Sequence, residues 1–141
     1  MTSAEAGTRP LAALVVDSSA PARLLVGAAL IEAGRRRGRA VHVTEAADGF
    51  EAIAQFPRGL FDLVVTALPL PTLTGLDLVR LLRARPEPGG VTIVALSGEG
   101  GEDETAALEA GATLCLGTPV DADALEKLLS GAGFFGGGGG C

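Results

Sequence analysis

Polar side chains that come after apolar runs are the residues of this sequence that could do chemistry. Asp17 and Ser18 directly follow the apolar run 11–16, Ser97 directly follows the run 91–96, and Thr118 comes shortly after the run 113–116. The carboxylate of Asp17 could hold a cation, and the hydroxyl groups of Ser18, Ser97 and Thr118 could donate hydrogen bonds to a small anion. No nucleophile with an adjacent base is visible, which argues against covalent catalysis.

Metal and cofactor chemistry have little support. His42 is the single histidine, and Cys115 and Cys141 are the two cysteines. They are too few for a histidine-based metal cluster, a zinc site or a disulfide framework. The stretch 131–136 matches G-x-G-x-x-G, but it follows a helical pattern and precedes polyglycine, whereas a dinucleotide site needs a strand before the motif. We therefore expect no cofactor. We also expect Asp17 to bond backbone amides at the next helix start rather than to hold a cation.

Short apolar runs alternate with helical patterns along the chain. The runs predict five strands, at Leu11–Val16, Ala40–Ala46, Leu63–Thr66, Val91–Leu96 and Thr113–Leu116. Four helix starts carry a capping residue, namely Ser19, Asp48, Thr74 and Asp121, and a weaker helix is expected at Glu102–Ala110. The helix faces expected to be buried are Leu24, Ala28 and Ile31; Phe50, Ile53 and Ala54; Leu78, Leu81 and Leu82; and Leu125, Leu128 and Leu129.

This alternation predicts an α/β fold with a five-stranded parallel sheet covered by helices on both faces. Right-handed crossovers restrict it to a doubly wound, flavodoxin-like topology. Ligands of such folds lie beyond the carboxyl ends of the strands, which brings together Asp17, Ser18, Ala67, Ser97 and Thr118. The 141 residues suit one domain at 11–130, after an extension at 1–10. Seven of the 21 glycines lie in 131–141, which we expect to be a flexible tail.

Five segments in register resemble the response-regulator receiver domains, a CheY-like (βα)5 family. They are Leu14–Ser19 with Pro21 and Arg23; Ala46–Ala52; Asp62–Val65 with Pro71 and Gly75–Leu78; Ala95–Ser97; and Ala110–Ala112 with Leu116, Thr118 and Pro119. The likeness covers about Leu11 to Leu129. It implies a pocket in which an aspartate accepts a phosphoryl group, helped by Mg²⁺, an acidic pair, a hydroxyl and a lysine.

Three positions of that pocket depart from the family pattern. Counting back from Pro71 and Gly75, the acceptor position holds Ala67, whose methyl group cannot attack phosphorus. The lysine position before Pro119 holds Thr118, and the second member of the acidic pair is Ser18. Asp17 and Ser97 keep the family chemistry, and the only lysine, Lys127, lies well inside the last helix. The resemblance therefore implies a degenerate receiver with at most a weak residual metal site at Asp17.

Acidic residues are concentrated in the second part of the chain. Residues 1–85 carry 8 acidic and 10 basic side chains, and residues 86–141 carry 9 acidic and 1 basic. In receivers the fourth helix, fifth strand and fifth helix commonly bind partners. That face would comprise Glu102, Asp103, Glu104, Cys115, Asp121 and Asp123, and its charge would suit a basic protein partner. Cys115 occupies the family's aromatic switch position. We expect the basic run 35–39 to be a solvated loop; a docking site for an acidic partner is the alternative.

These observations predict a stand-alone signalling protein of two-component or chemotaxis-type systems. It would act through phosphorylation-independent binding of a protein partner, such as a histidine kinase, and would not be an enzyme. The alternative is a small-ligand or anion sensor that uses the vacant pocket. A net charge of −6 argues against nucleic-acid and anionic-membrane partners. The N-terminal residues carry no secretory signal pattern, so the expected compartment is the cytoplasm.

Overall fold

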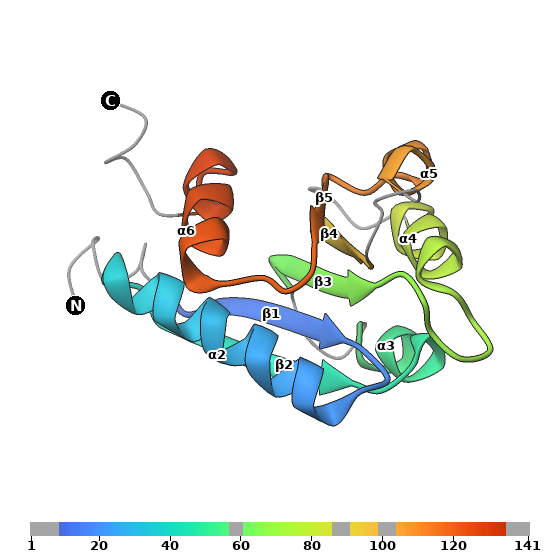
Figure 1. The fold of residues 1–141 in the computed structure, drawn as a ribbon, viewed down its shortest axis with the longest axis horizontal. Coiled ribbons are helices and arrows are strands. Elements are labelled where there is room, and N and C mark those ends of the chain that lie inside the picture. Colours follow the sequence, from blue (N-terminus) through green and yellow to red (C-terminus); the bar gives the residue numbers. More distant parts are fainter. Residues whose placement is uncertain (1–8, 57–60, 86–90, 99–103, 135–141) are drawn as a thin grey trace.

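The computed structural model describes residues 9–56, 61–85, 91–98 and 104–134, and these form one five-stranded parallel sheet (Figure 1). The strand order is β2-β1-β3-β4-β5. The strands are β1 (Leu11–Val16), β2 (Val41–Ala46), β3 (Leu63–Ala67), β4 (Thr92–Ser97) and β5 (Leu114–Gly117). Each lies within one residue of its predicted bounds, so the doubly wound α/β prediction is confirmed.

Helices α2 (Ala20–Arg36), α3 (Gly49–Gln55), α4 (Gly75–Arg83), α5 (Glu104–Ala110) and α6 (Ala122–Gly131) connect and follow the strands. The four predicted capping residues are confirmed, because each side chain accepts a hydrogen bond from a backbone N–H in the first turn of its helix. The predicted start of α5 at Glu102 lies outside the described residues, as does Asp103.

Two apolar layers enclose the sheet. On one face, α2 and α6 pack on side chains that include Val15, Val65 and Val94. On the other face, α3, α4 and α5 pack on side chains that include Leu14, Val64 and Ile93. Consecutive strand residues therefore point to opposite layers, and this explains why the strands read as continuous apolar runs.

The predicted buried face of α2 is wrong. Leu24 and Ile31 are exposed, as is Ala28, whereas Val26, Leu30 and Ala33 turn toward the sheet. Helix α2 carries apolar residues on both of these faces, so a periodicity of 3.6 residues fits either of them. The structure selects the face whose small residues allow close packing, since a Cβ at Gly34 would lie 2.5 Å from the Arg39 carbonyl oxygen.

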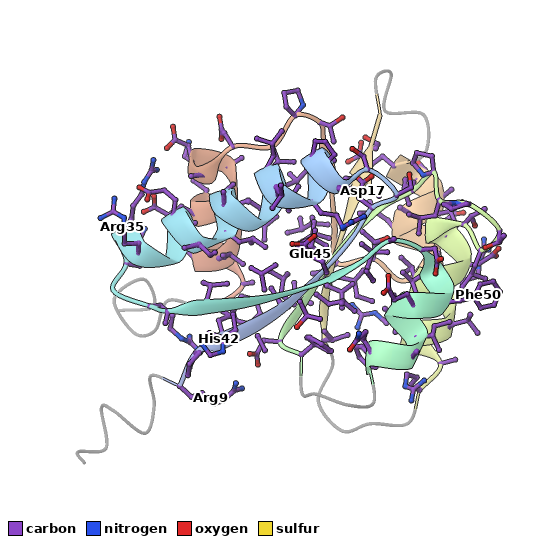
Figure 2. All side chains as sticks on the ribbon, turned by 90° about the horizontal axis from the view of Figure 1, so that it is seen from below. Arg9, Asp17, Arg35, His42, Glu45 and Phe50 are labelled. Atoms are coloured by element: carbon purple, nitrogen blue, oxygen red, sulfur yellow. The ribbon has the colours of Figure 1, made fainter. Side chains whose placement is uncertain are left out.

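Smaller corrections apply to α3 and α4. Phe50 was expected inside, but it is 60% exposed on the outer side of α3 (Figure 2), and Ala54 is exposed as well. Leu81 of α4 is also exposed. The remaining predicted face residues are buried or half-buried: Ile53, Leu78, Leu82, Leu125, Leu128 and Leu129.

The end of α6 is tied to the rest of the domain. Gly131 still belongs to α6, and Phe134 packs against the layer formed by α2 and α6. The carbonyl oxygen of Phe134 also accepts a hydrogen bond from Arg39. Residues 135–141 lie outside the described part of the chain. Among the described helices, none is both long and apolar enough to cross a membrane.

Candidate functional site

The predicted site residues meet at the carboxyl edge of the sheet. Asp17 directly follows β1, Ala67 ends β3, Ser97 ends β4 and Thr118 follows β5. The parallel register aligns Ala67 with Leu96 and Ser97 with Gly117, so these strand ends lie level with one another. Ser18 is exposed beside them. The topology therefore brings the five positions to one edge, as the sequence predicts.

Ala67 lies at the centre of this edge and is 6% exposed. Its carbonyl oxygen accepts a hydrogen bond of 2.9 Å from the Thr66 hydroxyl. The start of α4 presses against the same backbone, because a Cβ on Gly75 would lie 2.3 Å from the Ala67 carbonyl oxygen. In the sequence Gly75 is part of the family pattern and a reference for counting to position 67, and its structural role is to let α4 begin against the strand end. The side chain at position 67 supplies no nucleophile.

The hydroxyl groups of Ser97 and Thr118 face backbone carbonyls. Thr118 donates to the Ser97 carbonyl oxygen from both its backbone N–H, at 3.2 Å, and its hydroxyl, at 3.3 Å. The Ser97 hydroxyl lies 3.5 Å from the carbonyl oxygen of Leu116. The peptide bond between Thr118 and Pro119 is cis. These bonds join the ends of β4 and β5, and they engage two of the donors on which the ligand-sensor alternative depends.

Asp17 shapes the turn into α2. Its carboxylate accepts a 2.9 Å hydrogen bond from the backbone N–H of Ser19, which confirms the expected contact with a backbone amide. Arg23 donates to the Asp17 carbonyl oxygen at 2.7 Å and pairs with Glu45 at 2.8 Å. In the sequence Arg23 stands out only as part of the family pattern, and nothing in its spacing points to this bridge between the ends of β1 and β2.

The side chains at this edge do not provide the ligands of a Mg²⁺ site of the receiver type. Mg²⁺ in proteins is bound through carboxylates and demands near-octahedral oxygen geometry. Here Asp17 is accompanied by the hydroxyl of Ser18 and the methyl group of Ala67. Within the described ranges, no group of three or more His, Cys, Asp or Glu side chains could hold a metal ion.

Asp62 and Thr66 are the polar residues nearest to position 67 on its strand segment, and neither replaces an acceptor. Asp62 precedes β3, at the amino ends of the strands, where its carboxylate pairs with Arg9 at 2.7 Å. Thr66 is completely buried and belongs to the other side of the strand by the two-residue alternation.

The predicted partner-face residues lie in different surroundings. Glu104 is exposed at the start of α5, and Cys115 is half-buried against the layer formed by α3, α4 and α5. Asp121 caps α6, whereas Asp123 pairs with Arg36 of α2 at 2.5 Å. The predicted Glu102 and Asp103 lie outside the described residues. Asp123 thus faces α2, on the other side of the sheet from α5.

The basic run 35–39, which begins in the last turn of α2, forms ion pairs within the chain. Arg37 pairs with Glu126 of α6 at 2.7 Å, and Arg35 pairs with Glu32 at 2.7 Å. Hydrogen bonds from Arg35 and Arg36 lower the pKa of Glu32 to about 2, and hydrogen bonds to Asp123, Glu32 and Glu126 raise the pKa of Arg36. Arg35, Arg36 and Arg37 remain exposed, as expected of a solvated segment, but Arg35 and Arg36 belong to α2 rather than to a loop, and Arg36 and Arg37 also pair with acidic residues of α6.

The family model for the response regulator receiver domain matches residues 13–130. The chain belongs to this family. Among curated relatives, a protein-glutamate methylesterase/protein-glutamine glutaminase 1 of Caulobacter vibrioides is 36% identical over 83% of this chain. A gliding motility regulatory protein of Myxococcus xanthus is 34% identical over 91% of it. The matches span only 33% and 16% of those two proteins.

Solved receivers share the architecture. The chemotaxis response regulator CheY4 of Vibrio cholerae superposes with a TM-score of 0.73 at 27% identity, covering 86% of this chain and 98% of that one. A response regulator from Chloroflexus aurantiacus gives 0.75 at 26% identity, covering 86% and 97%. The chain is thus a receiver-domain signalling protein of the two-component or chemotaxis class. The receiver fold is typically not enzymatic.

Proposed function

We propose that this receiver does not accept a phosphoryl group and that it signals by binding a protein partner without phosphorylation. The observation that carries the proposal is Ala67 at the end of β3, buried against the start of α4, at the position where the family pattern requires an aspartate. Phosphoryl transfer to the protein needs a nucleophilic oxygen at that point, and a methyl group has none.

The neighbouring positions support the same conclusion. Ser18 replaces a carboxylate that would bind Mg²⁺, and Thr118 replaces a lysine that would neutralise the phosphoryl oxygens. The Thr118 hydroxyl is bonded to the Ser97 carbonyl oxygen. The acceptor, one metal ligand and the cation are all missing together, so the remaining Asp17 and Ser97 lack the groups with which they would act.

The proposed partner is a signalling protein, such as a histidine kinase, with a basic surface. Glu104 and Asp121 are exposed near β5 and offer acidic charge that would mainly raise the association rate. The acidic overall charge disfavours nucleic acid and anionic membranes as partners. A cytoplasmic location is part of the proposal.

The proposal is tested by rebuilding the pocket stepwise. Wild type, Ala67→Asp, and the triple variant Ala67→Asp, Ser18→Asp, Thr118→Lys are incubated with a small phosphodonor and Mg²⁺, and the bound phosphoryl group is quantified by intact mass. We expect no labelling of wild type. The single variant should be labelled roughly a hundredfold more slowly than the triple variant, because the metal ligand and the cation are still absent.

The double variant Ser18→Asp, Thr118→Lys is the matched control, because it restores the supporting groups without an acceptor. It should remain unlabelled, and far-UV circular dichroism should show that all variants are folded. Labelling of the wild-type protein on an aspartate would refute the proposal. Fast Mg²⁺-dependent labelling of Ala67→Asp alone would instead contradict the supporting role given to Ser18 and Thr118.

A further inference from the structure

Thr72, in the loop between β3 and α4, has an unusual backbone conformation. Its φ of 63° is the one positive φ outside glycine among the described residues. The Leu73 N–H donates to the Pro71 carbonyl oxygen at 2.7 Å, which closes a three-residue γ-turn around Thr72. A γ-turn with a positive φ at its centre is strained, and a β-branched side chain makes that conformation still less favourable. The loop therefore stores strain at a single residue.

The residues on both sides of Thr72 cannot absorb this strain. The ring of Pro71 fixes the φ of that residue near about −65°. On the other side, Thr74 caps α4 by accepting a hydrogen bond from the first turn of the helix, so its backbone is fixed as well. At the base of the loop, the Gly75 N–H donates to the Leu68 carbonyl oxygen at 2.8 Å. The loop is thus closed at its base, and its sharpest turn falls on Thr72.

Leu73 anchors the loop to the start of α3. A Cβ on Gly49 would lie 2.7 Å from Leu73 Cδ2 and 3.0 Å from Leu73 Cβ, so the leucine occupies the space that a side chain at position 49 would need. Gly49 is buried and Leu73 is half-buried. In Figure 1 the loop runs out beside α3 before it returns to α4. The packing of Leu73 over Gly49 therefore holds the strained turn against the domain.

The loop also borders the candidate site. It begins directly after Ala67, and Gly75 at its other end presses against the Ala67 carbonyl oxygen. Backbone strain of this kind persists only where the surrounding structure enforces it, and it is typical of clamps and switch regions. The conformation of the loop therefore determines whether α4 begins against position 67.

We propose that the β3–α4 loop is a strained latch with two states. In the closed state Leu73 packs on Gly49 and Thr72 holds the strained turn. In the open state Leu73 leaves Gly49, Thr72 relaxes to a negative φ, and the hydrogen bond between Gly75 and Leu68 breaks, which frees the start of α4. The strain favours opening, and the Leu73 packing opposes it. The proposal does not rest on the absence of phosphorylation.

Amide hydrogen exchange followed by NMR tests the latch, with the Gly75 amide as the reporter. This amide is hydrogen-bonded only while the loop is closed. After correction for intrinsic rates, it should exchange in the wild-type protein at least about a hundredfold faster than the amides of β3, because the latch opens locally and the central strand does not.

Relieving the strain should keep the latch closed. Thr72→Gly should slow the exchange of the Gly75 amide about tenfold, because glycine adopts a positive φ without steric cost. Thr72→Ala is the matched control, since alanine also removes the hydroxyl but keeps a Cβ, and its exchange should stay within about threefold of wild type. Neither substitution changes the intrinsic exchange rate of Gly75, because neither is its neighbour in the chain.

Displacing the anchor should open the latch. Gly49→Ala places a methyl group where Leu73 lies, so the Gly75 amide should exchange about tenfold faster than in wild type. Gly27→Ala is the matched control, because a Cβ there would lie 3.4 Å from Val43 Cγ1, an ordinary contact. It should leave the exchange of the Gly75 amide unchanged.

Three results would each overturn the latch. The first is a wild-type Gly75 amide as protected as the amides of β3. The second is equal Gly75 exchange in Thr72→Gly and Thr72→Ala, which would show that no strain acts on the loop. The third is equal Gly75 exchange in Gly49→Ala and Gly27→Ala, which would show that Leu73 does not hold the loop closed.

Discussion

Asp62 is five residues from the acceptor position in the sequence, but its carboxylate has a structural role at the other end of β3. It accepts hydrogen bonds from the Arg9 guanidinium at 2.7 Å and from the Ala12 backbone N–H at 2.9 Å. Burial raises the pKa of the Asp62 carboxyl, but the bonds from Arg9 and Ala12 outweigh burial and leave that pKa below its usual value. Asp62 thus joins the amino ends of β1 and β3, whereas Ala67 lies at the carboxyl end of β3.

This lowered pKa predicts a pH-dependent contribution to stability. A carboxyl group whose folded-state pKa lies below its unfolded value of about 3.9 stabilises the fold above that pH, and the stabilisation is lost as the pH falls through the folded-state pKa. Asp62→Asn should therefore lower the free energy of unfolding by about 1–2 kcal/mol at pH 7. The difference from wild type should shrink steadily below about pH 4.

Urea unfolding of both proteins at several pH values measures this difference. Arg9→Met is the matched variant, because it removes the cation and leaves the carboxylate with its Ala12 hydrogen bond, and it should show part of the same effect. A free energy of unfolding for Asp62→Asn that equals wild type at pH 7 would contradict this account of Asp62.

At the scale of the elements, Arg83 connects α4 with the two strands at the far end of the sheet. It donates to the carbonyl oxygens of Gly111 and Val91, both at 2.6 Å, and to the Thr113 hydroxyl at 2.9 Å. Burial lowers the pKa of the Arg83 guanidinium. The Thr113 hydroxyl also accepts from the Ile93 backbone N–H at 3.0 Å. The edge strand β5 is thereby aligned with β4 from its first residue.

Replacing Arg83 should loosen β5. Arg83→Met keeps the apolar stem but leaves two carbonyl oxygens and a hydroxyl without this donor, so we expect a loss of about 1–3 kcal/mol of unfolding free energy. Arg80→Met is the control on the same helix, because Arg80 is exposed and, among the described residues, pairs with Asp77 alone, at 3.3 Å. It should cost less than about 0.5 kcal/mol.

Hydrogen exchange can assign the loss caused by Arg83→Met to an element. The backbone amides of β5 should exchange faster in Arg83→Met than in wild type, while those of β1 should change less. Equal stability of Arg83→Met and Arg80→Met would show that the Arg83 hydrogen bonds do not hold the strand.

Strands and helix starts were predictable because local chemistry determines them. A strand buried on both faces must be continuously apolar, and a capping side chain must bond its own first turn, as Ser19 and Thr74 do. Helix faces were harder to predict. In α2, apolar residues occupy both sides of the helix: Leu30 and Ala33 face the sheet, whereas Leu24 and Ile31 face solvent. Only the packing of the whole domain therefore decides which side is buried.

At the scale of the whole molecule, folding redistributes the charge asymmetry of the sequence. The basic run at the end of α2 and the acidic residues of α6 are about 90 positions apart, yet Arg36 and Arg37 pair with Asp123 and Glu126. No local pattern could have predicted these pairs, because they depend on α2 and α6 covering the same face of the sheet. The candidate site was predictable because its residues follow strands that can be recognised locally, and parallel strands bring their carboxyl ends together.

The central claim is that a receiver fold with Ala67 at the end of β3 takes up no phosphoryl group. Intact-mass measurement of the wild-type protein, after incubation with excess phosphodonor and Mg²⁺ beside an aspartate-containing receiver as positive control, tests it most directly. The control should gain the mass of one phosphoryl group, and this protein should keep its original mass. A stable, hydroxylamine-sensitive phosphoryl group on this chain would contradict the account.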